Sequence, residues 1–329
     1  MTNVSPWRLC VAPMMEWTTS PCRIFHRLLS PHARLYTEMV HANAAIHGDR
    51  ARLLGFEAME HPVALQLGGS EPELLAQAAR IGEDVGYDEI NLNCGCPSER
   101  VQSGAFGACL MREPELVGDC VAAMRATVKI PVTVKCRIGV DGQDDDTDLF
   151  RFVDTVHRAG CDVFVVHARK AWLKGLSPKE NREIPPLNYD RVRRLRAEFP
   201  QLTIVLNGGL ASRAAVADVI GDFDGVMLGR AAYHEPYLLA ELERDLFDPT
   251  CALPDRADVL HGLRPYIDAR LARGESIAHF TRHLLGLYQG LPGARRFRRV
   301  LSENAHRPGT DFGLIEQALV EIAGIRAAA

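Results

Sequence analysis

The sequence predicts an α/β protein, a (β/α)8 TIM barrel followed by a small C-terminal all-helical domain. Three observations support this fold class: short apolar, β-branched runs alternate with amphipathic stretches, the alternation gives eight units, and it stops near residue 235. A doubly wound open sheet is the main alternative, but eight units favour a closed barrel. The expected strands are RLCVAP (8–13), RLYTE (34–38), VALQL (63–67), DEINLN (88–93), VTVKC (132–136), DVFVVH (162–167), TIVLN (203–207) and DGVMLG (224–229).

Helices are expected between these strands and beyond them. LFRFVDTVHRAGC (149–161) has apolar residues at i, i+3, i+4 and i+7 and ends at a glycine, as helices often do. After about residue 240 only helical patterns remain, and DPTCALPDR (248–256), with its two prolines, is a plausible linker. We therefore expect two domains, a barrel that carries the catalytic site over residues 1–240 and a helical domain over residues 241–329.

Composition limits the classes of partner. The chain has 329 residues, of which 47% are hydrophobic and 24% charged, and this is typical of a globular protein. Its net charge of −4 gives no general attraction to nucleic acid or anionic membrane, so a polyanion needs a local basic patch. No apolar run approaches the roughly 20 residues that span a bilayer, and the N-terminus lacks a signal-peptide pattern. The nine scattered cysteines indicate free thiols in a reducing compartment, so we expect a cytoplasmic protein.

Polar and small residues gather where the predicted strands end. In a barrel of this kind, catalytic groups lie at the C-terminal ends of the strands. The residues found there are Pro13, Met14 and Met15, Gln66, Asn93, Cys94 and Cys96, Lys135 and Arg137, His167 and Arg169, Asn207, Gly208 and Gly209, and Gly229 and Arg230. This concentration is the strongest functional signal in the sequence.

The last two strand ends predict a phosphate site. Loops after strands 7 and 8 commonly bind phosphate in such barrels, and free N–H groups at a helix N-terminus can hold an anion. Asn207, Gly208 and Gly209 precede a predicted helix, and Gly229 is followed by Arg230, whose guanidinium suits a phosphate. The alternative is that these glycines only form tight turns.

Lys135 lies on an otherwise apolar strand, where a lysine needs a partner. It is a candidate Schiff-base lysine, a cation beside a reduced flavin, or one member of a structural salt bridge. The amide of Gln66 and the imidazole of His167 suit the carbonyls and nitrogens of a flavin ring. A single histidine in an apolar run is more often a core residue, but His167 ends a strand.

Two cysteines follow the fourth strand. A zinc site needs four ligands and C-x-C has no second pair nearby, so we expect no metal; a redox dithiol favours C-x-x-C. Cys94 is compatible with simple core filling. Cys96 precedes Pro97 in a loop of small residues, and a thiol with an ordinary pKa can act as a general acid.

Together these segments resemble the tRNA-dihydrouridine synthase family over about residues 8–306. The strings that carry the resemblance are APMMEWT, QLGG, NLNCGCPSERVQSGAFGACL, VKCRIG, HARKAWLKGLSPKENREIPPL, LNGG, LGR and GLPGARRFRRVLSEN. SPKENREIPP and LSENAH resemble the DusA branch, which reduces uridines 20 and 20a in the tRNA D-loop.

The resemblance implies a monomer that uses FMN, takes reducing equivalents from NADPH and acts on tRNA. It implies that Cys96 is the proton donor and that Asn93 helps to place the uracil. The residues implied in FMN binding are Pro13, Met14, Met15, Gln66, Lys135, His167, Asn207, Gly208, Gly209, Gly229 and Arg230. Those expected to touch the tRNA are Arg137, Lys179, Asn181, Arg182, Arg295, Arg296, Arg298 and Arg299.

Residues 282–307 contain several arginines but only one acidic residue, Glu303, and Phe297 lies between two of the arginines. They are a candidate RNA surface or an ordinary solvated helix face. Three other functions stay open: a flavin barrel for a small molecule such as dihydroorotate or a free pyrimidine, a Schiff-base aldolase that uses Lys135, and a non-catalytic RNA chaperone.

Overall fold

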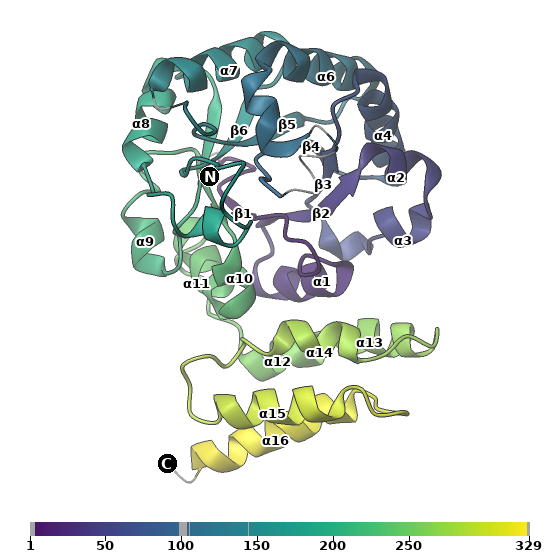
Figure 1. Ribbon diagram of the computed structural model, residues 1–329. Coiled ribbons are helices and arrows are strands. Elements are labelled where there is room, and N and C mark those ends of the chain that lie inside the picture. The colour runs from purple at the N-terminus through teal and green to yellow at the C-terminus, as the bar shows by residue number, and fades with distance from the viewer. Residues whose placement is uncertain (1–3, 99–103, 105, 144, 328–329) are drawn as a thin grey trace. The chain divides into compact units, whose positions relative to one another are not determined.

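The computed structural model describes residues 4–98, 104, 106–143 and 145–327 (Figure 1). The chain divides into two compact units. The first contains residues 1–15 and 34–229, and the second contains residues 16–33 and 230–329. The domain boundary expected between residues 240 and 241 lies within a helix of the second unit, α11 (Tyr237–Leu246).

The first unit is a closed barrel of eight parallel strands in sequential order, so the predicted barrel is confirmed (Figure 1). Strand β1 pairs with β8 through Leu9–Val226, Cys10–Met227 and Val11–Leu228, and this pairing closes the sheet. The strands are β1 (Leu9–Val11), β2 (Arg34–His41), β3 (Val63–Gly68), β4 (Glu89–Cys94), β5 (Val132–Arg137), β6 (Val163–His167), β7 (Thr203–Asn207) and β8 (Gly225–Leu228).

Helices of the first unit connect successive strands around the outside of the barrel. The helix predicted from the LFRFVDTVHRAGC pattern is α7: the Asp145 carboxylate accepts from the N–H groups of Thr147 and Asp148 at its start, and Gly160, at a φ of 106°, follows its end. The helices of this unit are α2 (Ala42–His47), α3 (Arg50–Leu54), α4 (Pro72–Val85), α6 (Pro114–Thr127), α7 (Asp146–Arg158), α8 (Tyr189–Glu198) and α9 (Arg213–Ala217), with 3-10 turns at Ala58–Glu60, Gly107–Arg112 and Glu180–Arg182.

Alternate residues of each strand point into the barrel. On β1, β6, β7 and β8 the inward residues are mainly apolar, and Cys10, Val165, Val205 and Met227 belong to one buried cluster. On β3, β4 and β5 many inward residues are polar, although most are buried. These polar residues are Gln66, Glu89, Asn91, Asn93, Thr133 and Lys135.

All regular secondary structure in the described part of the second unit is helical. In α15 the buried residues Ala294, Phe297, Val300 and Leu301 form one face, and the arginines between them lie on the other. The helices are α1 (Ser20–Leu29), α10 (Arg230–His234), α11 (Tyr237–Leu246), α12 (Arg256–Gly262), α13 (Arg264–Leu271), α14 (Ala278–Leu284), α15 (Ala294–Asn304) and α16 (Gly313–Ala327). Within the described ranges of both units, the helices are too short or too polar to cross a bilayer.

Candidate active site

The strand register brings the predicted site residues to two successive levels at the C-terminal end of the barrel, with Asn93 and Lys135 at one level and Arg137, His167 and Asn207 two residues further along their strands. Asn93 pairs with Lys135, Arg137 with His167, and His167 with Asn207. Side chains from β4 to β7 therefore converge there, although they are separated in sequence by more than a hundred residues. The prediction that polar groups gather at this end is a consequence of parallel strand direction.

Lys135 lies among groups that disfavour its positive charge. Its ammonium Nζ donates to Asn207 Oδ1 at 3.2 Å, and Asn207 Nδ2 donates in turn to the Met227 carbonyl at 2.7 Å. Burial, followed by the charge of Arg137, lowers the pKa of Lys135 to about 8. A half-buried amine that donates to an amide oxygen and is acted on by the charge of Arg137 is well suited to an anionic ligand.

His167 is held in its neutral form. Burial and then the positive charges of Arg137 and Lys135 lower its pKa well below the ordinary value. At neutral pH the imidazole therefore offers one N–H donor and one acceptor without adding a proton.

Gly208 and Gly209 shape the backbone beside His167. Gly208 has a φ of 110°, and a Cβ added there would lie 2.6 Å from His167 Cδ2. Gly209 has a φ of 73°, and its added Cβ would lie 2.4 Å from Leu187. Both positions thus need glycine. The Tyr189 hydroxyl donates to the Gly208 carbonyl at 2.6 Å and fixes the loop.

Asn93 and Gln66 form the link between strand β4 and the cysteine loop. Asn93 Nδ2 donates to Gln66 Oε1 at 2.9 Å, and Asn93 Oδ1 accepts from the backbone N–H groups of Gly95 and Cys96, each at 3.0 Å. The side chain of Asn93 therefore sets the turn that leads into Cys96.

The two cysteines differ sharply. Cys94 is fully buried, and burial raises its pKa well above the ordinary value, which fits the core-filling interpretation. Cys96 is half-buried, and its thiol donates to Ser98 Oγ at 3.4 Å. Residues 99–103 and 105 of the NLNCGCPSERVQSGAFGACL segment lie outside the described residues.

Arg137 connects two loops of this structure through hydrogen bonds. Only 3% of it is exposed, and its guanidinium donates to the carbonyls of Gly95, Lys170 and Asn181, each at 2.9 Å. Burial lowers its pKa to about 10. It thereby joins the loops that follow β4 and β6, and its charge acts on Lys135 and His167.

The SPKENR loop contains residues of two kinds. Lys179 and Arg182 are exposed, as a tRNA contact requires. Asn181 is fully buried: its Oδ1 accepts from the Trp172 N–H at 2.8 Å and its Nδ2 donates to the Trp172 carbonyl at 2.9 Å. In this structure Asn181 organises the loop that presents its two cationic neighbours.

The remaining predicted residues lie at the ends of β1 and β8 and on α15. Pro13 and Met14 are half-buried and Met15 is 58% exposed. A Cβ on Gly229 would meet nothing within 4 Å, and Arg230 begins α10 in the second unit.

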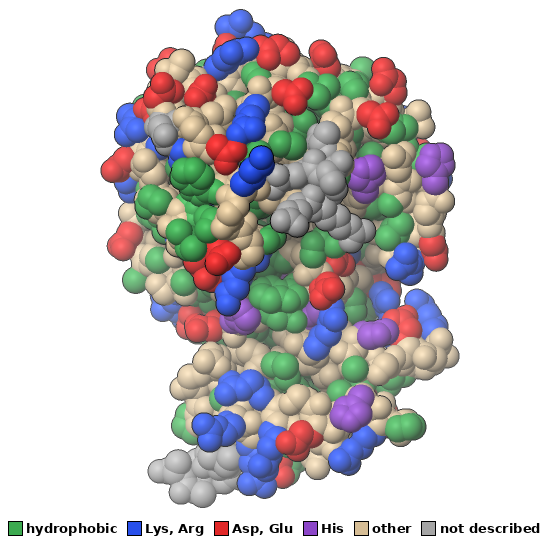
Figure 2. Space-filling model, in the orientation of Figure 1, with side chains coloured by type: hydrophobic (Ala, Val, Ile, Leu, Met, Phe, Trp, Pro, Cys, Tyr) green, Lys and Arg blue, Asp and Glu red, His purple; other side chains and the backbone are tan. Residues whose placement is uncertain are grey.

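On α15, Arg295, Arg296 and Arg299 are exposed and Arg298 is half-buried, whereas Phe297 is fully buried. Several Lys and Arg side chains, coloured blue, are visible on the surface of the second unit (Figure 2). Arg296 pairs with Glu321 at 2.5 Å, and Arg298 donates to Gln289 at 2.7 Å. The interleaved phenylalanine belongs to the core of the second unit, where it packs against Tyr288 with ring centroids 4.9 Å apart.

These residues fit a flavin phosphate and ring. The groups that act on Lys135 besides burial are Arg137, Arg182, Cys96 and Cys136, so arginines and thiols dominate its surroundings. Gly208 and Gly209 let the backbone pack closely against His167 and Leu187, and the space beside Gly229 is open. A cationic site with a glycine cradle suits a ligand with a phosphate and an anionic ring.

Three buried residues beneath this site were not predicted. Glu89, Asn91 and Thr133 lie one and two layers deeper in the barrel and are hydrogen-bonded to one another or to site residues. A signal was present, because DEINLN carries polar residues at alternate positions of an otherwise apolar strand, and that spacing places them on one face.

Comparisons with known proteins agree with the geometry. The chain is 63% identical over 313 residues to the tRNA-dihydrouridine(20/20a) synthase of Xanthomonas campestris, with 94% of this chain and 92% of that protein covered. It is 55% identical to the protein of the same name from Vibrio cholerae, with 96% of each covered. A solved structure of 2-naphthoyl-CoA reductase with 2-naphthoyl-CoA aligns with a TM-score of 0.55 at 10% identity, covering 71% of this chain and 49% of that one; it shows the fold alone. The dihydrouridine synthase family model matches residues 10–323, and the chain therefore belongs to the dihydrouridine synthase family.

Proposed function

We propose that this protein reduces the C5=C6 bond of uridines 20 and 20a in the D-loop of tRNA. The observation that carries the proposal is the junction at Asn93, whose side chain holds the backbone of Cys96 while Asn93 itself pairs in register with Lys135. A potential proton donor and a cationic cofactor site therefore lie on neighbouring strand ends. The names of the relatives support the two uridine positions.

The proposed cofactor is FMN, with NADPH as the reductant. If bound at the strand ends, this cofactor would provide the hydride chemistry that reduction at C6 of the uracil ring needs. We propose that Lys135, Gln66 and His167 bind the ring, with Pro13, Met14 and Met15 along it. The phosphate is proposed to lie at Asn207, Gly208, Gly209, Gly229 and Arg230.

The chain's own residues account for the rest of the reaction. The Cys96 thiol holds the proton that C5 takes up, and Asn93 orients the uracil as well as the Cys96 turn. His167 stays neutral and so donates one hydrogen bond to the ring without adding charge. Arg137 holds the loops that flank the site.

The target base has to leave its stacked position to reach the barrel, and this requires further contacts to the tRNA. We propose Lys179 and Arg182 of the first unit, and Arg295, Arg296, Arg298 and Arg299 of the second, as phosphate contacts. Binding through these groups falls as salt concentration rises, because it releases condensed counterions.

The test is the Cys96→Ser variant, with Cys109→Ser as the matched control. Both thiols are half-buried and belong to the first unit, but only Cys96 follows the Asn93 turn. A serine hydroxyl is a far weaker acid, so Cys96→Ser should bind flavin and tRNA but form dihydrouridine about 10²–10⁴-fold more slowly. Dihydrouridine is measured in unmodified tRNA transcripts by mass spectrometry.

Two results contradict the proposal. Near-normal dihydrouridine formation by Cys96→Ser would remove the thiol from the reaction. Turnover of NADPH with free uracil or another small molecule, without tRNA, would favour the small-molecule flavin enzyme instead.

A further inference from the structure

We propose that Glu89, Thr133 and Asn91 form the base of a buried hydrogen-bonded column that positions Asn93 and, through it, the Cys96 turn. These residues touch neither substrate nor cofactor in the proposed reaction, so they are positioning residues. The inference rests on the proposed function for its catalytic consequence, but the column itself is measurable without any activity.

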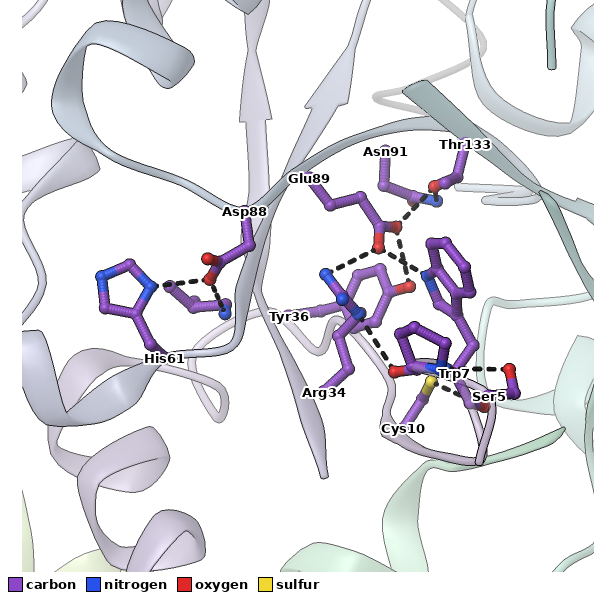
Figure 3. A network of polar contacts seen from close by, with 12 residues as sticks. Ser5, Trp7, Cys10, Arg34, Tyr36, His61, Asp88, Glu89, Asn91 and Thr133 are labelled. Carbon is purple, nitrogen blue, oxygen red and sulfur yellow. Dashed lines mark hydrogen bonds and ion pairs between the residues drawn. The ribbon is translucent and has the colours of Figure 1, made fainter. Parts of the chain in front are cut away.

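The column begins at a buried carboxylate. Glu89 is 0% exposed and accepts hydrogen bonds from Trp7 Nε1 at 2.7 Å and from the Tyr36 hydroxyl at 2.8 Å (Figure 3). Arg34 approaches the same carboxylate at 3.2 Å. Burial and then the neighbouring Glu89 raise the pKa of Tyr36 well above its ordinary value, so its hydroxyl remains a donor. Because its buried charge is paired and hydrogen-bonded, Glu89 is a fixed anchor.

From Glu89 the hydrogen bonds run toward the C-terminal end of the barrel. Thr133 donates to Glu89 Oε1 at 2.5 Å and accepts from Asn91 Nδ2 at 2.8 Å (Figure 3). Asn91 Oδ1 accepts from Gln66 Nε2 at 2.8 Å, and Gln66 Oε1 accepts from Asn93 Nδ2 at 2.9 Å. The strand period explains the spacing, since residues 89, 91 and 93 of β4 point to the same side.

Every donor in this column points toward Glu89. A carboxylate at one end accepts only, and the backbone N–H groups of Gly95 and Cys96 at the other end donate only, each to Asn93 Oδ1. If the amide of Gln66 turned over, its NH2 group would face that of Asn93 and its oxygen would face that of Asn91. The two fixed ends thus give each amide one favourable orientation, and that of Asn93 decides where the Cys96 turn lies.

A purely structural role explains this arrangement poorly. The interior of such barrels is usually filled by branched apolar side chains, and a buried polar group is costly unless it is satisfied. Here polar side chains of β3, β4 and β5 form a continuous series of hydrogen bonds below the Cys96 turn, whereas Val165, Val205 and Met227 at comparable positions of β6, β7 and β8 are apolar. The column extends from the buried carboxylate to the cysteine turn.

Thr133 offers a matched pair of substitutions. Thr133→Val keeps the shape but removes the hydroxyl, whereas Thr133→Ser keeps the hydroxyl but removes a methyl group. We expect Thr133→Val to accelerate hydrogen exchange of the Gly95 and Cys96 amides by about tenfold, as for the loss of ~1.4 kcal/mol of local stability, with Thr133→Ser close to wild type. In the tRNA assay, Thr133→Val should lower kcat by about tenfold and leave KM for tRNA nearly unchanged.

Tyr36→Phe is the control for a general loss of stability. It removes a hydrogen bond to the same carboxylate oxygen as Thr133, but one that lies outside the column. We expect it to lower the unfolding midpoint while exchange at Gly95 and Cys96 and the kcat stay at wild-type values. Asn91→Ala breaks the column one step nearer to Cys96 and should reproduce the exchange result even if Thr133→Val does not fold.

Two outcomes would overturn the inference. One is exchange at Gly95 and Cys96 that is unchanged in Thr133→Val and Asn91→Ala; the other is a larger effect of Thr133→Ser than of Thr133→Val, which a packing role predicts. Failure of the proposed function is separate, because it appears as a wild-type protein that makes no dihydrouridine, whatever the exchange rates are.

Discussion

The barrel interior contains two regions of different chemistry. On the side of β3, β4 and β5, inward residues such as Gln66, Asn91 and Thr133 are polar and hydrogen-bonded to one another. On the side of β6, β7, β8 and β1, Val165, Val205 and Met227 belong to a hydrophobic cluster, which also includes Tyr36 of β2 and Ala64 of β3. Both regions support strand ends with site residues, Asn93 and Lys135 in one case and His167 and Asn207 in the other.

The difference shows two ways to hold a site residue in place. In apolar packing only steric fit restricts the rotation of a side chain. A polar network with all its hydrogen bonds made also fixes the direction of each donor and acceptor. The polar region lies in the barrel interior below the turn at Cys96, and the apolar region lies in the interior below the glycine loop at Gly208. The thiol that we propose as proton donor needs a defined direction, whereas the loop that we propose for the phosphate is shaped by its own backbone at Gly208 and Gly209.

The largest expected effect is on the anchor of the polar region. Glu89→Gln removes the negative charge that faces the buried Arg34, and the new amide NH2 competes with the donors Trp7, Tyr36 and Thr133. Breaking a buried pair in this way costs about 3–5 kcal/mol of unfolding free energy. Urea denaturation followed by circular dichroism measures it. A midpoint equal to wild type would mean that Glu89 is not a charged anchor.

The next largest expected effect is a loss of unfolding free energy when the apolar region loses a side chain. Met227→Ala leaves a cavity in the cluster and should cost about 2–4 kcal/mol of unfolding free energy, while the backbone carbonyl that accepts from Asn207 is retained. Because this residue lies outside the polar column, exchange at Gly95 and Cys96 should not change in native conditions. Acceleration as large as that in Thr133→Val would show that the two regions are not independent.

Much of the barrel was predictable because its signals are local. Most strands are short apolar runs that end at or beside a polar or glycine residue, and parallel strands place those ends together. The sequence alone therefore assigns Lys135, His167 and Asn207 to one end of the barrel. The glycines at 208 and 209 were predicted for the same reason, and their positive φ values agree with it.

What the sequence did not predict depends on side-chain direction and on long-range contacts. The column below Asn93 lies in strand interiors and not at strand ends, so it was missed although its alternate spacing is visible. Asn181 and Arg137 were expected at the tRNA, but both are buried and hold loops together through backbone carbonyls. Phe297 seemed interleaved with surface arginines, yet the helical period turns it into the core of its unit.

The smallest expected effect is a pH dependence of the unfolding free energy that comes from Lys135. Val165, which pairs with Lys135 in register, provides the control because it does not titrate. Burial lowers the pKa of Lys135 from 10.5 to about 8 in the folded protein. Between these values the unfolded chain binds the proton and the folded chain does not, so stability rises with pH across this window. In the flavin-free protein, the unfolding free energy of wild type minus that of Lys135→Met should rise by about 1 kcal/mol from pH 7 to pH 9. The difference between wild type and Val165→Ala should stay constant, because no titrating group is removed. Urea denaturation at several pH values measures both differences in unfolding free energy. A Lys135→Met difference that does not change with pH would mean that the amine keeps an ordinary pKa and that water reaches the polar region around Lys135.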